Sequence, residues 1–376
     1  RSIFVPDEIA GYPPLFGMYL ALGWKLFDKS LPVSHFLMLP FLIGIVVQLQ
    51  RLVSHFIKPG HTFWVLLLVL LEPTLLAQAT QVSPDIILVF LYLYSLNCIL
   101  SRNRAALPLA LLALSFLSPR GAIVVAALYF TEVALSVTGS NDSSGVKKLL
   151  RPVPAYLPAF ILTCFWLYFH YNHYGWILYN KDSAWGQGAE LVGLKGFLKN
   201  LAVIGWRFAD FGKLIPFMLL LLLLLQKGRQ NVQDHTFHRL LVLILVPFAI
   251  LSSVLLFYQN PIAHRYYIVV FMLSLLLLGY LLQFVRGVRL KFAYGIILVS
   301  LLTGHYSVAL YPDRVAKGWD GTLAHLPYFE LRYKMNTYLK EEGITTQEVG
   351  SAYPNLRTTA WIDLSEQNSI NFSEKD

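Results

Sequence analysis

The chain has 376 residues, of which 56% are hydrophobic and only 14% are charged, and its formal net charge is +9. Soluble domains usually carry about a quarter charged residues, so this composition excludes an ordinary soluble protein. The positive charge would suit a nucleic acid, but the Lys and Arg residues lie in short loops between long apolar runs, which argues against that partner.

The N-terminal segment, residues 1–31, is polar and aromatic. We expect it to form an extracytoplasmic loop and, over 14–27, an interfacial helix too short to cross a membrane. Because the chain begins with Arg1 in a polar stretch, we expect further residues, including a first span, to precede it. The apolar runs that follow predict about ten membrane spans. They fall near 32–51, 61–80, 85–100, 105–118, 121–137, 153–170, 213–226, 239–258, 266–285 and 291–311.

Three parts of the chain depart from this regular alternation. The spans 105–118 and 121–137 are short and meet at a polar break. The loop 171–212 contains a helix-like run, and we expect it to be a partly interfacial extracytoplasmic element. Residues 312–376 turn polar, with an amphipathic helix and then strand-like residues. The predicted fold class is therefore an all-α polytopic membrane domain over 1–311, followed by a small extracytoplasmic α/β appendage that we expect to be cut short.

The distribution of Lys and Arg predicts the orientation. Alternating spans place one set of basic residues on a common side: Arg51, Lys58, Arg102, Arg104, Lys147, Lys148, Arg151, Lys227, Arg229, Arg239, Arg286, Arg289 and Lys291. The short loops on the other side hold only Arg120 and Arg265. Since cytoplasmic loops carry the excess of Lys and Arg, both chain ends and the loop 171–212 should face the periplasm or exterior of a bacterial inner (plasma) membrane.

Ionisable side chains from four distant parts of the chain are predicted to meet at this extracytoplasmic edge. They are Asp7, Glu8, Asp85, Arg120, His264 and Arg265. Ionisable groups at membrane depth are costly and usually functional. Their predicted convergence is the main indication of a site.

The acidic residues each allow two interpretations. Asp7 and Glu8 could act as a general base toward a hydroxyl acceptor or bind a divalent metal, or they could be solvated loop acids. Asp85 begins a span, where an Asp is also a favoured N-cap. Glu72 precedes Pro73 inside a span, and we expect it to pair with a neighbouring helix or to satisfy backbone groups that the proline leaves free.

The basic residues are likewise open to a functional and a structural interpretation. Arg120 and Arg265 could clamp a lipid-linked phosphate, because the guanidinium fork matches phosphate oxygens, or they could extend to lipid headgroups. His170 and His173 close a span with a spacing that could place both on one helix face as metal ligands. They could equally be ordinary residues of the membrane interface.

No Walker loop, GxGxxG, HExxH or GxSxG motif is present in the sequence. Nucleotide hydrolysis and serine or zinc-protease chemistry therefore lack their usual signatures.

Five segments resemble, in order, the GT-C glycosyltransferases, in particular the protein O-mannosyltransferase (family 39) and aminoarabinose transferase branch. GYPPLFGMYLALGWKLFDKSLPVSHFLMLPFLIGIVVQLQRLV resembles their first loop and following span, with Tyr12 where the (H/K)PPL-type motif has His or Lys. VSPDIILVFLYLYSL resembles their Asp at the top of a later span, and LLALSFLSPRGAIVVAAL their broken helix pair. FHYNHYGWI and PIAHRYYIVVF resemble the entry to their long loop and their late HRY-type motif, so that the resemblance covers residues 11 to about 270.

The resemblance implies a GT-C-like helical bundle and an inverting transfer of a sugar from a polyprenyl-phosphate donor to a glycan, lipid or protein acceptor outside the cytoplasm. It assigns the base to Asp7 or Glu8 if the first loop is short, and otherwise to a carboxylate before Arg1. The other roles that it implies are support of the site by Asp85, donor-phosphate binding by Arg120, Arg265 and His264, and loop contacts to the acceptor by Tyr12 and Trp185.

Two other classes of protein remain open. A secondary transporter would show paired broken helices in two related halves with binding at the midplane, whereas this sequence has one short broken pair and no internal repeat. A non-catalytic membrane scaffold would keep the fold and lack turnover.

Overall fold

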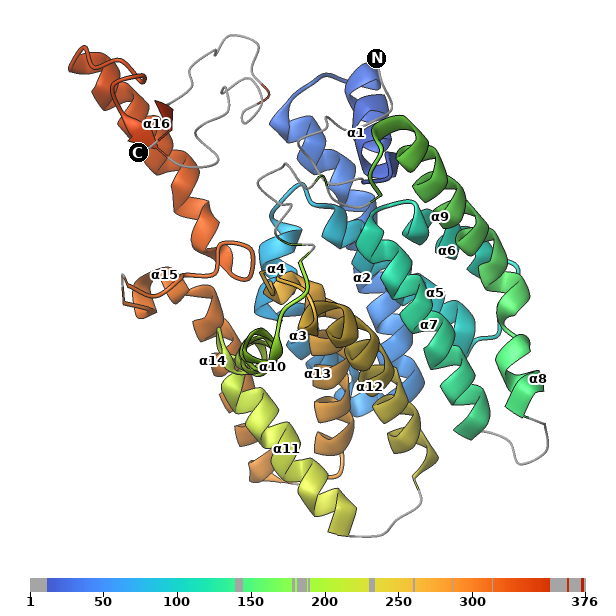
Figure 1. Ribbon diagram of the computed structural model, residues 1–376. Coiled ribbons are helices and arrows are strands. Elements are labelled where there is room, and N and C mark those ends of the chain that lie inside the picture. The colour runs from blue at the N-terminus through green and yellow to red at the C-terminus, as the bar shows by residue number, and fades with distance from the viewer. Residues whose placement is uncertain are drawn as a thin grey trace.

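The computed structural model describes residues 12–138, 145–177, 190–229, 234–259, 261–285, 287–312 and 314–351, together with 180, 188, 364 and 373–374. Within these residues the protein is an all-α bundle (Figure 1). The helices of the first half are α1 (Leu15–Leu26), α2 (Leu31–Phe56), α3 (Pro59–Leu70), α4 (Pro73–Ala79), α5 (Pro84–Leu100), α6 (Leu107–Ser115), α7 (Pro119–Thr138), α8 (Gly145–Leu150) and α9 (Val153–Tyr174). Those of the second half are α10 (Leu194–Ala209), α11 (Leu214–Arg229), α12 (His235–Leu256), α13 (Ile268–Leu282), α14 (Val288–His305), α15 (Ser307–Leu310) and α16 (Leu326–Glu341), with the 3₁₀ turns η2 (His264–Tyr267) and η3 (Leu323–His325).

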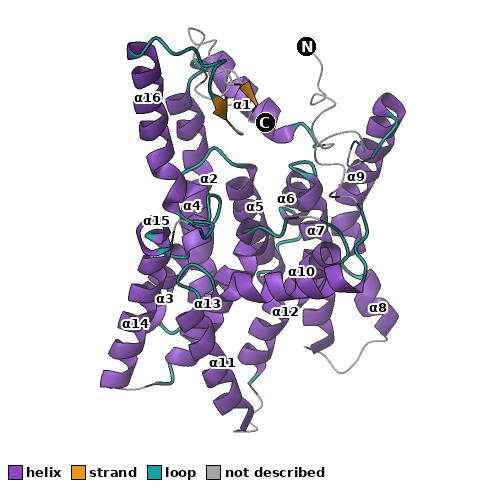
Figure 2. Cartoon of the chain, turned by 60° about the vertical axis from the view of Figure 1, so that its left-hand side comes forward, coloured by secondary structure: helices purple, strands orange, loops and turns teal. Residues whose placement is uncertain are grey.

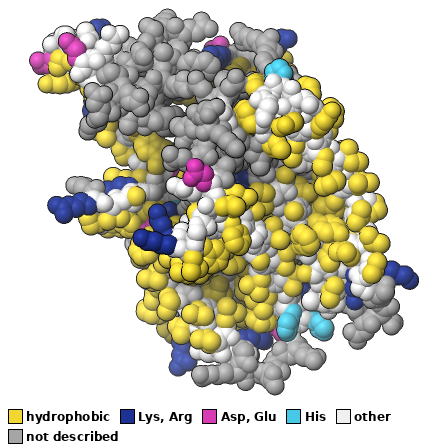
Figure 3. Space-filling model, viewed as in Figure 1, with side chains coloured by type: hydrophobic (Ala, Val, Ile, Leu, Met, Phe, Trp, Pro, Cys, Tyr) yellow, Lys and Arg dark blue, Asp and Glu magenta, His cyan; other side chains and the backbone are white. Residues whose placement is uncertain are grey.

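Several of these helices are long and apolar enough to cross a membrane. Six qualify alone among the described residues: α2, α7, α9, α12, α13 with η2, and α14. Two more candidates are bent pairs, α3 with α4 at 65° and α10 with α11 at 96°. Their outer surfaces are apolar, and hydrophobic side chains dominate the face shown in Figure 3. The prediction of an α-helical, membrane-embedded protein is thereby confirmed.

The centre of the bundle is α13. All of its residues are buried, as expected for a helix that is hydrophobic on every side. It packs against α3, α11 and α12. Because η2 leads directly into α13, the polar residues of η2 are carried on the most deeply enclosed helix of the protein.

Two predicted elements differ from the structure in shape. The span expected over 61–80 is broken between α3 and α4, because Pro73 has no N–H to continue the helix. The loop expected over 171–212 contains α10, which lies across the upright helices in Figure 2. One side of α10 is exposed and apolar, and Asn200 and Ile204 are buried on the other.

The helix connections separate into two ends. Figure 1 shows α8, the end of α11 and the start of α12 at the same lower end of the bundle. Elsewhere in the bundle, α5, η2 and η3 all contact the short helix α4. Beyond α16, the described C-terminal residues include two short strands, β1 (Gly350–Ser351) and β2 (Ser373–Glu374), which pair in parallel.

Candidate functional site

Asp85 lies in the first turn of α5. Pro84 starts this helix, and the Ser83 hydroxyl caps it by accepting a hydrogen bond from the Asp85 N–H at 3.1 Å. Of the two interpretations of Asp85, the structure does not support the helix cap, because Ser83 fills that position. Its carboxylate is buried, 4% exposed, and is left to face the arginines.

Arg120 reaches Asp85 from the second residue of α7. Its Nη2 donates to Asp85 Oδ1 in a short ion pair. The turn between α6 and α7 is tight: a Cβ on Gly121 would lie 1.9 Å from the Leu114 carbonyl oxygen, so only glycine permits this approach. The close packing of the two helices places Arg120 at the same level as Asp85.

Arg265 completes this group from η2. Its Nε lies 3.8 Å from Asp85 Oδ2 and 3.5 Å from Asp320 Oδ2. This nitrogen atom has no hydrogen-bond partner within the described part of the chain. The Tyr266 ring lies beside both guanidinium groups, 4.8 Å from that of Arg120 and 5.7 Å from that of Arg265. We call Asp85, Arg120, Arg265 and Asp320 the arginine cluster.

The space inside the arginine cluster is small. Asp85, Arg120, Arg265 and Tyr266 help to line a cavity of about 10 Å³, which is room for roughly one water molecule. A larger anion would therefore have to approach from the outer side of Arg265, whose side chain is 39% exposed.

Asp320 comes from the turn before η3. The Gln78 side chain donates to the Asp320 carbonyl at 2.9 Å and accepts from the Ser83 hydroxyl at 2.7 Å, so it ties this turn to the start of α5. A Cβ on Gly321 would lie 3.2 Å from the His264 ring, so glycine lets the turn lie close to η2. The Asp320 side chain remains 30% exposed.

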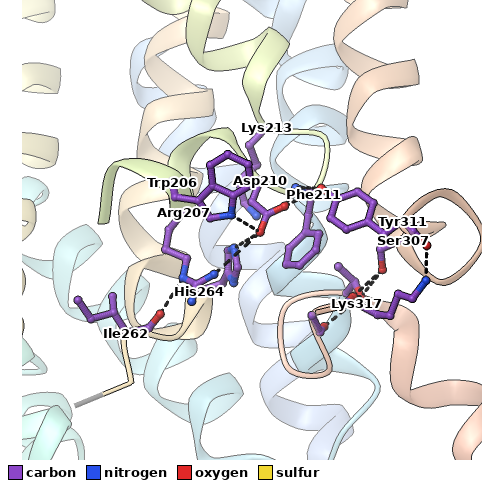
Figure 4. Close-up of polar contacts among 12 residues, drawn as sticks. Trp206, Arg207, Asp210, Phe211, Lys213, Ile262, His264, Ser307, Tyr311 and Lys317 are labelled. Atoms are coloured by element: carbon purple, nitrogen blue, oxygen red, sulfur yellow. Dashed lines mark hydrogen bonds and ion pairs between the residues drawn. The ribbon is translucent and has the colours of Figure 1, made fainter. Parts of the chain in front are cut away.

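Figure 4 shows a second group, the Asp210 cluster. It is joined to the arginine cluster through η2, where His264 and Arg265 are neighbours. Asp210 ends α10, and three donors bind its carboxylate: the Tyr311 hydroxyl at 2.6 Å, the Phe211 N–H at 2.9 Å and the Trp206 indole N–H at 3.1 Å. His264 Nε2 lies 3.6 Å from Asp210 Oδ2 and is buried. Burial, together with the hydrogen bond to Asp210, raises the pKa of Tyr311 to about 12, so this hydroxyl stays protonated and donates.

The backbone beside Asp210 is strained. Phe211 has φ = 50° and Gly212 has φ = 74°, and a left-handed conformation is unusual for a bulky residue. A Cβ on Gly212 would lie 2.0 Å from the Ser300 carbonyl oxygen, which shows how closely the bend between α10 and α11 packs against α14. Strain of this kind persists where the surrounding packing holds it and is common at functional sites.

A buried ion pair joins the two bent helix pairs. Glu72 Oε1 lies 3.4 Å from Lys213 Nζ, and both side chains are 1% exposed. Glu72 also accepts from the Leu75 N–H at 2.6 Å, which caps α4. Both roles expected of Glu72, pairing with another helix and satisfying backbone near the proline, are present. Another acid inside a span, Glu132 of α7, binds Arg104 and the Tyr156 hydroxyl.

The two histidines proposed as metal ligands lie in an aromatic group at the end of α9. His170 Nδ1 is 2.9 Å from the Trp176 carbonyl, and its ring contacts Trp176. The His173 ring contacts Tyr174. Over the residues that the structure describes, no group of three His, Cys, Asp or Glu side chains could hold a metal ion. The metal site stays a prediction.

The remaining predicted residues are placed as follows. Asp7, Glu8 and Trp185 lie outside the described residues. Tyr12 lies just before α1 with its side chain exposed. His264 was expected beside Arg265 as a phosphate ligand, and the structure turns it toward Asp210 instead.

The sequence interpretation missed Asp210, Lys213, Tyr311 and Asp320. Asp210 and Lys213 could have been noticed as charged residues directly before a long apolar run, where an unpaired charge is costly. Asp320 stands between two nearby glycines, which indicates a tight turn but not a site.

Comparison with known proteins adds no relative. No family model matches this chain, and neither a curated protein nor a solved structure is significantly similar to it.

Proposed function

We propose that the protein is an inverting glycosyltransferase that moves a sugar from a polyprenyl-phosphate donor to an acceptor on the extracytoplasmic side of the membrane. The observation that carries the proposal is the arginine cluster, in which Asp85 lies between Arg120 and Arg265. These three residues come from three different helical elements, α5, α7 and η2. This agrees with the roles that the GT-C resemblance implies for the same residues.

The cluster suits a lipid-linked phosphate for two reasons. Guanidinium groups bind phosphate oxygens in a bidentate manner, and Asp85 holds two of them together. The N-termini of α5 and α7 also meet here, and helix N-termini favour anions. As the bond from the sugar to the phosphate breaks, the same groups would stabilise the charge on the departing phosphate.

The resemblance supplies the remaining parts of the proposal. It assigns the base to Asp7 or Glu8, and Tyr12 and Trp185 to acceptor loops. A divalent metal, with His170 and His173 as candidate ligands, is a condition that the assay must vary. The acceptor class, whether glycan, lipid or protein, follows from the product.

The proposed topology has ten spans. It counts the six long helices, the two bent pairs, and the shorter α5 and α6. Helix α8, the end of α11 and the start of α12, which lie at the lower end of the bundle in Figure 1, carry Lys147, Lys148, Lys227 and Arg239. These basic residues support a cytoplasmic location for that end. The site then faces the periplasm of a bacterial inner membrane, and residues 312–376 form an extracytoplasmic α/β appendage.

The test is turnover by the purified full-length protein. The protein is incubated with radiolabelled polyprenyl-phosphate sugars, with Mg²⁺, with Mn²⁺ and with chelator, and released polyprenyl phosphate is measured. We expect release that disappears in a heat-inactivated sample. If no donor is turned over under any of the metal conditions, the proposal is wrong.

A secondary transporter is the second candidate, and one observation favours it. Two bent helix pairs meet at the buried Glu72–Lys213 ion pair, and discontinuous helices commonly form the binding sites of transporters. Uptake of a labelled solute into proteoliposomes, lost in Glu72→Gln and Lys213→Met, would support this function. Turnover of a polyprenyl-phosphate sugar without uptake would exclude it.

A further inference from the structure

We propose that Asp320 is the general base that takes the proton from the acceptor hydroxyl. The inference rests on the proposed glycosyl transfer and names a residue of that site which the sequence did not indicate. It differs from the assignment by resemblance, which places the base at Asp7 or Glu8.

Accessibility distinguishes Asp320 from the other described carboxylates of the two clusters. Asp85 and Asp210 are 4% and 5% exposed at their side chains, whereas Asp320 is 30% exposed. Asp85 is held by Arg120, and Asp210 by the hydroxyl of Tyr311 and two N–H groups. An incoming hydroxyl can therefore reach Asp320, while the other two carboxylates are enclosed and already bound.

The turn that carries Asp320 is well fixed. The Thr322 hydroxyl is 2.8 Å from the Lys317 carbonyl and 2.9 Å from the Ser307 hydroxyl, and the Gly321 N–H donates to the Gly318 carbonyl at 2.9 Å. Gln78 holds the Asp320 carbonyl from α4. A base must be held within reach of the proton that it removes, and these contacts hold the backbone of Asp320 beside Arg265.

The charge balance frees Asp320 when the donor binds. In the arginine cluster, Arg120 and Arg265 are balanced by Asp85 and Asp320. Two carboxylates lie beside Arg265 Nε, Asp320 at 3.5 Å and Asp85 at 3.8 Å, and both are too far for a strong hydrogen bond. Asp85 is buried and also paired with Arg120, whereas Asp320 is partly exposed. A phosphate that approaches the exposed side of Arg265 would therefore displace the exposed partner, Asp320, and leave that carboxylate next to the bound donor.

The step that follows is balanced as written. The Asp320 carboxylate takes the proton of the acceptor hydroxyl, and the acceptor oxygen forms a bond to the anomeric carbon of the sugar. The bond from that carbon to the polyprenyl-phosphate oxygen breaks, and its electron pair stays on the phosphate, which Arg120 and Arg265 hold. The proton leaves Asp320 to solvent after product release.

Asp320→Asn tests the inference because it removes the base and keeps the shape of the side chain. General bases contribute about a hundredfold or more to turnover, so we expect kcat to fall by about that factor. Binding of the unglycosylated polyprenyl phosphate should be unchanged or tighter, since Arg265 loses a competing carboxylate. Asp320→Glu should recover part of the activity. Glu330→Gln is the matched control, because Glu330 is an exposed acid that pairs only with Lys334 on α16 among the described residues.

The results separate this inference from the proposed function. If the unaltered protein turns over no donor, the proposed function has failed. If it is active and Asp320→Asn keeps its kcat, or loses kcat and polyprenyl-phosphate binding together, Asp320 is not the base. If Asp7→Asn or Glu8→Gln abolishes turnover while Asp320→Asn does not, the base is the one that the resemblance implies.

Discussion

Asp85 is the residue on which the two arginines depend. Asp85→Asn keeps the size of the side chain but removes the charge that aligns Arg120 and Arg265. We expect kcat/KM to fall by about tenfold or more, which corresponds to about 1.4 kcal/mol or more. Arg265→Ala should have an effect of the same order, and Arg265→Lys a smaller one, because lysine keeps the charge and loses the planar fork. The measurement is steady-state turnover of a polyprenyl-phosphate sugar.

The control for these variants is Arg289→Ala, an exposed arginine at the start of α14, at the other end of the bundle. It should leave the rate unchanged. Wild-type rates in both Asp85→Asn and Arg265→Ala would remove the arginine cluster from the reaction.

His325 gives the protein a dependence of stability on pH. Burial lowers the pKa of His325 below its ordinary value of 6.5, although the Thr322 carbonyl accepts a hydrogen bond from its Nδ1. Below pH 6.5, His325 is therefore protonated to a greater extent in the unfolded chain than in the folded protein. The free energy of unfolding falls as the pH falls through this range. One proton can contribute a slope of at most about 1.4 kcal/mol per pH unit.

Thermal unfolding of the detergent-solubilised protein between pH 7.5 and pH 5 would measure this effect. His325→Gln should unfold at a temperature that depends less on pH than that of the unaltered protein. Equal pH dependence of the two proteins would show that His325 is not the responsible group.

At the scale of single elements, the polar side chain of Asn200 joins α10 to the end of α12. The Asn200 amide lies 3.3 Å and 3.1 Å from the carbonyls of Leu255 and Leu256, the last residues of α12, and 3.1 Å from the carbonyl of Tyr258 just beyond it. Asn200→Ala would leave these carbonyls without that donor, and we expect a loss of about 1–3 kcal/mol of unfolding free energy. Asn200→Asp should be worse, because a carboxylate repels carbonyl oxygens.

Hydrogen exchange in α10 and thermal unfolding would check this prediction. Lys199→Ala changes the neighbouring exposed residue and serves as the control. If Asn200→Asp is as stable as the unaltered protein, Asn200 does not anchor α10. The helix matters for the site because Asp210 is its C-terminal cap.

At the scale of the whole molecule, the Glu72–Lys213 pair connects the two halves of the chain across the bundle. Lys213→Met would leave the Glu72 carboxylate buried without its cation, and breaking a buried pair in this way typically costs about 3–5 kcal/mol. The double variant Lys213→Met with Glu72→Gln should recover most of this loss, since no charge is left buried and Gln can still accept from the Leu75 N–H. Chemical denaturation of the double variant and of the two single variants, Lys213→Met and Glu72→Gln, measures the coupling. Additive losses would show that the two residues do not act as a pair.

The sequence alone determined the membrane class, because long apolar runs have no other stable environment. It also brought Asp85, Arg120 and Arg265 to one edge, since alternating spans decide which loops share a side. It left open whether Asp85 caps α5, because Ser83 and Asp85 are both good caps and only the local backbone decides between them.

Only the tertiary structure decided the partners of those residues. The approach of Asp320 to Arg265, of Tyr311 and His264 to Asp210, and of Lys213 to Glu72 each joins segments far apart in the chain. Such contacts depend on the bends between α3 and α4 and between α10 and α11 and on the close packing at Gly121 and Gly212. Hydrophobic periodicity records which segments are apolar, but it carries no information on the angle at which two of them meet, and that angle positions the charged groups of the site.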